Sequence, residues 1–162
     1  LSVDCCVDLL ILTINTTSNI ITKMEELAST LPEYDTVRNM EGCGAKLTPR
    51  IIAEIGDIRR FKNVGSIIAY GGLDAPPYQS EQFEATIRHI SKRGNKYLRK
   101  AGYEVMKSIK SSGKAGNELY DYISKKEEEG KAKKVAKIAG LNKFIRMYYG
   151  KVREKYRELE IW

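Results

Sequence analysis

Ser80 stands in a part of the chain whose residue types favour chemistry on phosphate. Pro76-Pro77 lie just before it, and a basic stretch from Arg88 to Lys100 follows it. Two consecutive prolines exclude helix and stiffen the backbone in an extended form, so residues 78–80 are expected at a defined position. A hydroxyl held beside clustered positive charge predicts a serine that meets a phosphate group.

The basic side chains near Ser80 are the candidates for contacts to nucleic-acid phosphates. His89 is the chain's one histidine and a candidate base, although a histidine without a placed partner is more often a hydrogen-bonding surface or core residue. Ser91 is a rival serine, but its position favours the N-cap of the following basic helix. The candidate phosphate contacts are Arg88, His89, Lys92, Arg93, Lys96, Arg99 and Lys100.

A second set of candidate contacts lies in the turn Gly42-Cys43-Gly44, which Lys46 follows. A hydrophobic residue between two glycines, flanked by helical stretches, is typical of helix-hairpin-helix modules. Their glycines let backbone N–H groups approach a phosphate closely. The alternative is a tight connection between core helices, which such turns also make. Thr48, with Pro49 after it, is expected to cap the next helix, and Asn63 and Asn117 are expected to cap two later helices.

The N-terminal part of the chain predicts a long helix that ends or kinks at Pro32. Its apolar positions alternate spacings of three and four, as in the a/d seam of a coiled coil. Pairing with another chain and packing on the chain's own core are equal alternatives for this helix, and the first makes a homo-oligomer the expected assembly. The seam positions are Val7, Leu10, Ile14, Thr17, Ile21, Met24, Ala28 and Leu31.

Downstream of Gly94 the chain predicts further helices. The first has the apolar face Leu98, Ala101, Gly102, Val105 and Ile109 and a basic face beside it. Two more follow residue 112, and their tyrosines are expected in a core or interface rather than against bases. The predicted fold is all-α: a coiled-coil-like helix at 1–36, a compact helix-hairpin-helix-like domain with a Pro-rich loop at 37–111, and a helical tail at 112–162 packing on that domain.

Composition favours a polyanionic partner. The 162 residues include 28 Lys+Arg and 21 Asp+Glu, a net charge of +7, which makes nucleic acid the leading candidate. Cys5, Cys6 and Cys43 form no CxxC pair, so neither a zinc site nor a disulfide framework is predicted, and a reducing cytoplasm fits. The most apolar stretch is broken at Asp8, so no membrane-spanning segment is expected.

Several of these residues occur together, in one order, in a known family. The ordered set resembles the C-terminal transposase domain of the insertion-sequence "one-ten" family, the bridge-RNA-guided recombinases related to the Piv invertase. The resemblance is strongest from about Val37 to Ser111. It rests on Gly42-Cys43-Gly44, Ala53-Glu54-Ile55-Gly56-Asp57, Phe61, Ala69-Tyr70-Gly71-Gly72-Leu73, Tyr78-Gln79-Ser80 and Ile90-Ser91-Lys92-Arg93-Gly94-Asn95-Lys96-Tyr97-Leu98-Arg99.

The resemblance implies that Ser80 is the nucleophile of DNA strand exchange. It also implies DNA and a guide (bridge) RNA as partners, and a RuvC-like domain, in cis or in trans, whose DEDD carboxylates hold Mg2+. No such acidic set precedes Val37, so the chain resembles a C-terminal fragment, inactive alone and carrying no metal or cofactor of its own. The family has glycine after the serine, where this chain has Glu81. The alternatives are a non-catalytic helix-hairpin-helix nucleic-acid-binding module and a helical protein-interaction domain.

Overall fold

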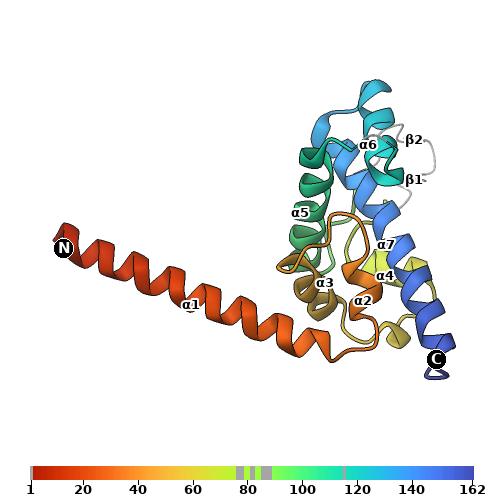
Figure 1. Cartoon of the computed structure of the whole chain (residues 1–162). Helices are drawn as coiled ribbons and strands as arrows, with labels where there is room; N and C mark the ends of the chain where they lie inside the picture. Colours follow the sequence, from red (N-terminus) through yellow and green to blue (C-terminus); the bar gives the residue numbers. More distant parts are fainter. Residues whose placement is uncertain (1, 76–78, 81–82, 85–88, 115) are drawn as a thin grey trace.

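A computed structural model describes residues 2–75, 79–80, 83–84, 89–114 and 116–162. The fold is all-α, as predicted, with a long helical arm and a compact body (Figure 1). The helices are α1 (Val3–Ser29), α2 (Tyr34–Arg38), α3 (Leu47–Ile55), the short 3-10 helix η1 (Ile58–Arg60), α4 (Val64–Tyr70), α5 (Lys96–Ser112), α6 (Glu118–Glu128) and α7 (Lys133–Glu158).

Two strands of two residues each lie within the segment that carries Ser80. β1 (Gln79–Ser80) pairs antiparallel with β2 (Phe83–Glu84), so that Ser80 lies opposite Phe83. Only the backbone of these strand residues is described. The Pro76-Pro77 loop, Glu81 and Arg88 lie outside the described residues.

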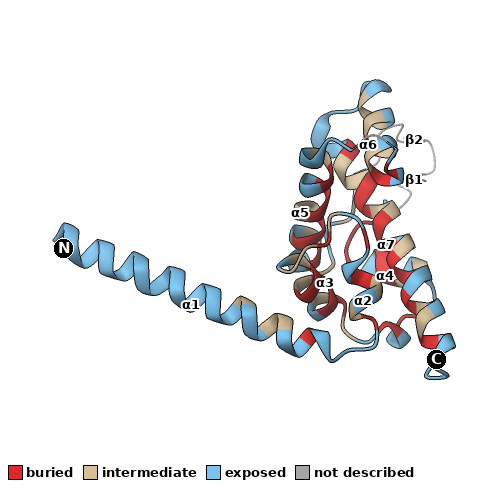
Figure 2. Cartoon of the chain, viewed as in Figure 1, coloured by how far each residue is buried: buried red, intermediate tan, exposed pale blue. Residues whose placement is uncertain are grey.

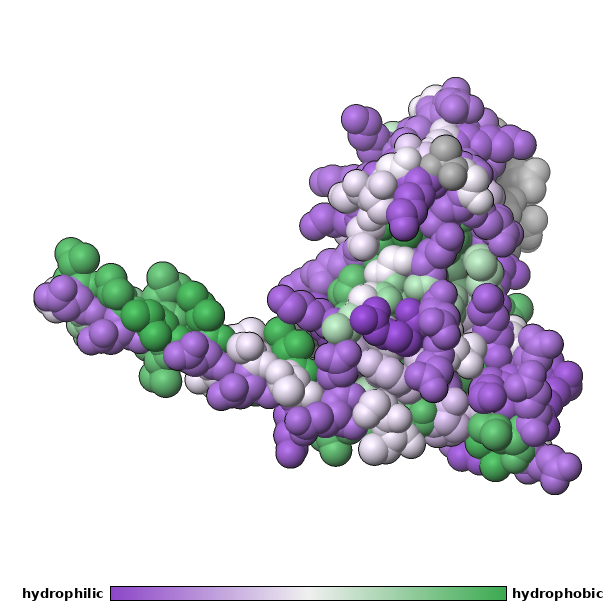
Figure 3. All heavy atoms as spheres, in the orientation of Figure 1, coloured by the Kyte–Doolittle hydropathy of each residue, from purple (hydrophilic) through white to green (hydrophobic). Residues whose placement is uncertain are grey.

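The predicted N-terminal helix is confirmed as α1, which projects away from the body (Figure 1). The Ser2 side chain accepts the N–H of Cys5 at its start, and the helix ends before Pro32. Ala28 is its only buried residue, and the rest of the arm is exposed or half-buried (Figure 2). Apolar side chains cover much of its N-terminal half (Figure 3). Most of the apolar side chains of α1 are therefore exposed to solvent.

The sequence analysis expected no membrane-spanning segment. α1 is nevertheless long and apolar enough to cross a membrane, by length and composition alone. The single acidic residue Asp8 does not make the helix too polar for this. Signal sequences near an N-terminus and core helices of soluble proteins have the same length and apolar composition.

The body has one continuous apolar core, to which α2 through α7 all contribute. The apolar face predicted for α5 is confirmed, since Leu98, Ala101, Gly102, Val105 and Ile109 are all buried. The expected core position of the C-terminal tyrosines is confirmed as well, since Tyr148, Tyr149 and Tyr156 are buried on α7. Tyr149 also donates a hydrogen bond from its hydroxyl to the Phe61 carbonyl, at 3.2 Å. Burial against the body explains why α7 is stable despite the glycines within it.

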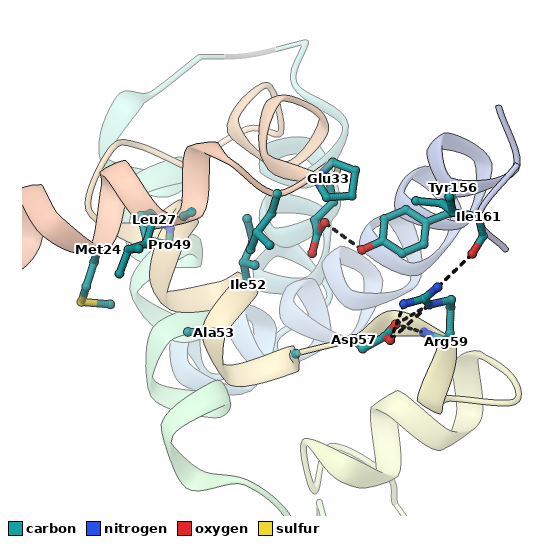
Figure 4. A pocket seen from close by; sticks show the side chains of 14 residues that line it. Met24, Leu27, Glu33, Pro49, Ile52, Ala53, Asp57, Arg59, Tyr156 and Ile161 are labelled. Carbon is teal, nitrogen blue, oxygen red and sulfur yellow. Dashed lines mark hydrogen bonds and ion pairs between the residues drawn. The ribbon is translucent and has the colours of Figure 1, made fainter. Parts of the chain in front are cut away.

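An apolar cavity of about 620 Å³ lies where α1 joins the body. Met24 and Leu27 of α1 face Pro49 and Ile52 of α3 across it (Figure 4). At its edge the Tyr156 hydroxyl donates to the buried Glu33 carboxylate, at 2.8 Å. A largely apolar lining with carboxylates at its rim does not suit phosphate, so this cavity is not the nucleic-acid site.

Helix caps agree with the sequence in part. Asn63 and Asn117 cap α4 and α6 through their side chains, as predicted. The cap expected at Thr48 is wrong, because α3 begins at Leu47 and Thr48 lies inside its first turn. The N–H groups of both residues donate to the Gly44 carbonyl, so the helix starts directly from the glycine turn.

Candidate functional site

The two ends of the segment that carries Ser80 are held side by side. We call residues 75–90 the Ser80 segment, and the contact between residues 70–74 and 91–95 the Gly72–Gly94 junction. Three backbone hydrogen bonds form the junction, from the N–H of Ser91 to the Asp74 carbonyl (2.8 Å), from Lys92 to Gly72 (3.1 Å) and from Asn95 to Tyr70 (2.6 Å). The body thus fixes where the segment leaves and where it returns.

Two glycines allow the close approach of the two chains at the junction. Gly72 has a φ of 61°, and a Cβ there would lie 2.6 Å from the Gly94 nitrogen. A Cβ on Gly94 would overlap the Tyr70 carbonyl oxygen and lie 2.5 Å from the Gly72 nitrogen. Because the obstructing atoms are backbone, they cannot move aside as a flexible side chain could. The junction therefore requires glycine at both positions.

Arg99 braces the junction from α5. Its Nη1 donates to the carbonyl oxygens of Gly71 (2.8 Å) and Gly94 (3.0 Å), one from each side of the junction. The sequence placed Arg99 among the candidate phosphate contacts. In the structure the side chain is half-buried, and this guanidinium nitrogen bonds backbone carbonyls.

Asn95 ties the junction to two other helices. Its side-chain oxygen accepts the N–H groups of Tyr97 and Leu98, which caps α5. Its amide nitrogen donates to a Glu54 carboxylate oxygen (2.9 Å) and lies 3.1 Å from the Tyr70 hydroxyl. That hydroxyl donates in turn to the Glu54 carbonyl, at 3.1 Å. One side chain therefore connects α3, α4 and α5, and Glu54 and Tyr70 are supporting residues that had no predicted role.

Ser91 does not cap α5, contrary to the prediction. Asn95 is the cap, because it is the residue immediately before the helix and has extended backbone angles. The Ser91 hydroxyl instead donates to the Asp74 carboxylate, at 2.5 Å. This bond closes the junction next to the Ser80 segment, and sequence reasoning gave Asp74 no role.

Most of the predicted basic contacts surround the junction and the start of α5. His89, Lys92, Arg93, Lys96 and Lys100 are all exposed, whereas Arg88 and the Ser80 side chain lie outside the described part. Lys92 has a φ of 56°, an uncommon backbone conformation for a lysine, which indicates that the surrounding contacts hold the turn.

Tyr97 is a further exposed residue at the start of α5, and sequence reasoning gave it no separate role. Its side chain is 59% exposed, unlike the buried tyrosines of α7, and the Lys96 ammonium lies 5.1 Å from its ring centroid. An exposed aromatic ring beside a cation is a typical contact for a nucleic-acid base.

The glycine turn at residues 42–46 lies apart from the Gly72–Gly94 junction. A Cβ on Gly42 would lie 2.7 Å from Ile109 and 2.9 Å from Val105, so this glycine permits close packing on α5. Gly44 and the exposed Lys46 lie in the same turn. Val105 lies about 14 Å along the α5 axis from Lys96. The turn and the junction therefore do not form one compact site.

The part of the chain that the structure describes has few groups suited to other chemistry. Burial raises the pKa of the Cys43 thiol to about 12, which keeps it protonated at neutral pH. Among the described residues, no three His, Cys, Asp or Glu side chains gather as a metal site would require. The junction and its basic surroundings are the best-supported site.

Comparison with known protein families gives a match over the middle of the chain. Residues 34–121 match the family described as "Transposase IS116/IS110/IS902 family". No curated protein matches the chain. The matched residues contain α2 to α5, the glycine turn and the whole Gly72–Gly94 junction. Because the match spans more than half of the 162 residues and confirms the resemblance carried by the ordered motifs, the chain belongs to this transposase family.

Proposed function

We propose that this chain is the DNA-binding C-terminal domain of an insertion-sequence transposase and that Ser80 is its nucleophile. The Gly72–Gly94 junction is the observation that supports the proposal. It anchors both ends of the Ser80 segment beside the exposed basic residues Lys92, Arg93 and Lys96. A fold that restricts the position of the nucleophile speeds its attack, because aligning the nucleophile with the phosphate accounts for a large part of the activation free energy.

The proposed reaction is transfer of a DNA strand to the serine. The Ser80 Oγ forms a bond to phosphorus while the bond from phosphorus to the departing deoxyribose oxygen breaks. The serine proton passes to a base, and the departing oxygen gains a proton. The new serine–DNA ester keeps the energy of the phosphodiester for rejoining. Because the described residues hold no metal-ligand cluster, we assign activation of the serine to the family's RuvC-like domain, in cis or in trans.

Side chains rather than the helix end would hold the phosphates near α5. Asn95 already accepts the N–H groups of Tyr97 and Leu98, which an anion at a helix N-terminus would otherwise use. Lys92, Arg93 and Lys96 then supply the charge, and the exposed Tyr97 ring supplies a surface for a base. Gly44 and Lys46 would contact the backbone of the same nucleic acid further along α5.

The assembly follows from the family and from α1. A bridge RNA would supply target specificity, and pairing of the exposed α1 helices would form a homo-oligomer. A bridge RNA and a homo-oligomer are both compatible with a protein that acts on DNA in the prokaryotic cytoplasm. The net charge of +7 is consistent with binding two nucleic acids.

Removal of the nucleophile is the direct test. With the RuvC-like domain supplied, we expect Ser80→Ala to abolish covalent adducts with end-labelled DNA on denaturing gels and to leave DNA affinity unchanged. Ser111→Ala, at an exposed position on α5, is the matched control and should keep full adduct yield. Adducts that persist in Ser80→Ala would remove Ser80 as nucleophile and favour the non-catalytic helix-hairpin-helix module.

A substitution at Glu81 is expected to raise the adduct yield, whereas Ser80→Ala is expected to abolish it. A carboxylate next to an incoming phosphate is repulsive, and the family has glycine at this position. We expect Glu81→Gly to raise the adduct yield in the same assay. A yield that falls or stays constant would show that Glu81 does not oppose the reaction.

The junction itself is tested with a pair of glycines. Gly94→Ala places a methyl group against the Tyr70 carbonyl, so we expect adduct yield to fall at least about tenfold. Gly150→Ala adds the same methyl group to α7, where no atom lies within 4 Å, and should leave the yield unchanged. Equal yields from the two variants would show that the junction does not position the serine.

A further inference from the structure

We propose that a pocket between α6 and α7 binds a phosphate of the DNA strand that leads to Ser80. We call it the Tyr122 pocket. Its volume is about 440 Å³, and Tyr122, Ala139, Asn142, Lys143 and Arg146 line it. All five lie beyond residues 34–121, the part that matches the transposase family. The inference rests on the proposed function, because it assumes that DNA reaches Ser80.

Asn142 connects this pocket to the base of the Ser80 segment. Its amide nitrogen lies 3.4 Å from the Leu73 carbonyl oxygen, at the Gly72–Gly94 junction. Its amide oxygen accepts a hydrogen bond from the Arg146 Nε, at 3.0 Å. One amide therefore touches the junction on one side and orients a guanidinium in the pocket on the other.

Chain length limits how far Ser80 can be from this pocket. A fully extended backbone from Leu73 to Ser80 spans at most about 25 Å. A DNA strand advances about 3.4 Å per nucleotide along the duplex axis. A phosphate in the Tyr122 pocket and the phosphate at Ser80 can therefore belong to the same strand, within about seven nucleotides of each other. A contact at that distance would set the register of the strand.

The charges in the pocket favour an anion. The Lys143 ammonium lies 4.8 Å from the Tyr122 ring centroid and 2.9 Å from a Glu118 carboxylate oxygen. The Glu118 side chain is 65% exposed, so solvent screens this ion pair and a phosphate can compete for the lysine. Lys126 does not line the pocket, but its ammonium lies 5.7 Å from the same ring and pairs with Glu129.

Phosphate fits the pocket better than a nucleic-acid base or an apolar ligand. Tyr122 is half-buried, unlike the exposed Tyr97, so less of its ring is open to a base. Arg146 donates to the Asn142 oxygen through its Nε only, so the terminal amino groups of the guanidinium are the atoms that would meet phosphate oxygens. The apolar cavity at α1 has Arg59 in its lining, and that guanidinium is already paired with Asp57.

The test compares two losses of charge on one helix. Lys143→Gln with Arg146→Gln removes two positive charges from the pocket, and Lys133→Gln with Lys134→Gln removes two exposed ones at the start of α7. Fluorescence anisotropy with a fluorescein-labelled DNA duplex measures affinity across a salt series for the whole chain. We expect the pocket variant to bind about tenfold more weakly and to lower the salt slope by about 1 to 2, with less than a threefold loss in the control.

Each outcome separates the two proposals. Equal losses in the two variants would overturn the pocket and leave the proposed function intact. Wild-type protein that fails to bind the duplex, or binds it without salt dependence, would overturn the proposed function and the pocket with it. Lys143→Arg keeps the charge and should bind like wild type. A tenfold loss in that variant would point to a packing role for the lysine, and unchanged circular dichroism of all variants confirms that they fold.

Discussion

The two longest helices, α1 and α7, are almost equal in length and opposite in environment. α1 has 27 residues and buries only Ala28, whereas α7 has 26 and buries a complete face, from Ala136 to Tyr156. Leucines and isoleucines of α1 face solvent while tyrosines of α7 lie in the core. Apolar residues thus do not determine which helix is buried. Position relative to the other helices does, because α7 is part of the body whereas α1 projects from it with its apolar residues uncovered.

The largest expected difference is between core and arm substitutions. Phe144→Ala removes a side chain of α7 that is fully buried, so we expect the free energy of unfolding to fall by about 3–5 kcal/mol. Leu12→Ala removes an α1 side chain that is 62% exposed and should cost less than about 0.5 kcal/mol. Urea denaturation measures both. Similar losses would mean that α1 is as well packed in solution as α7.

Two glycines of α7 should respond in opposite directions. A Cβ on Gly140 would lie 2.6 Å from an Ile123 carbon, so Gly140→Ala is expected to cost about 1–3 kcal/mol through overpacking. Gly150 has no neighbouring atom within 4 Å, so alanine there should add about 0.5–1 kcal/mol through helix propensity. Thermal unfolding gives both signs. A stabilising Gly140→Ala would show that α6 and α7 are more loosely packed than described.

High pH should weaken the anchoring of α7. Burial raises the pKa of Tyr148 and of Tyr156 above the ordinary value of 10.0. The unfolded chain then loses these protons first, so the contribution to stability is complete below pH 10 and is lost as the pH rises above it. Denaturation midpoints between pH 8 and 11 test this.

The Cys43 thiol also contributes to the loss of stability at high pH, and its contribution begins at a lower pH than that of the tyrosines. Its pKa rises from 9.0 to about 12 through burial, so its contribution begins to fall above pH 9. Tyr148→Phe should reduce the loss at high pH without harm at neutral pH, because the Tyr148 hydroxyl has no hydrogen-bond partner among the described residues. A variant with an unchanged pH profile would exclude the tyrosine as a source of the effect.

The smallest effect on stability, and the largest on assembly, is expected in α1. Leu10→Ala with Ile14→Ala alters the seam, and we expect self-association to weaken while the unfolding of the body changes by less than about 0.5 kcal/mol. Leu9→Ala with Leu12→Ala removes side chains of similar exposure that lie off the seam. Sedimentation velocity distinguishes the pairs, and equal weakening would exclude pairing through the predicted seam.

Local patterns were predictable where neighbouring residues decide the outcome. The buried face of α5 and the caps at Asn63 and Asn117 depend on spacing and residue type within one or two turns. The caps predicted at Thr48 and Ser91 were wrong for two different reasons. The nearby Gly44 carbonyl starts α3 earlier than expected, and the Ser91 hydroxyl donates to Asp74, which lies 17 residues away in the sequence.

In the candidate site, too, some properties were predictable from the sequence and others depended on the fold. The ordered motifs indicated the family and the basic stretch after Ser80, but not what each residue does. Arg99 counted as one more cation in the sequence. In the fold its guanidinium bonds the carbonyls of Gly71 and Gly94. The Tyr122 pocket had no sequence signal, because its residues come from two helices and acquire a shared role only when these pack together.

The sequence by itself determined the all-α class, the family and the apolar face of α5. Those properties depend on periodicity, composition and motif order, which a linear chain displays directly. Only the tertiary structure decided that α7 completes the core, that α1 remains uncovered and that Gly72 and Gly94 meet. These depend on contacts between residues distant in the sequence, whose close approach is set by packing of the whole body.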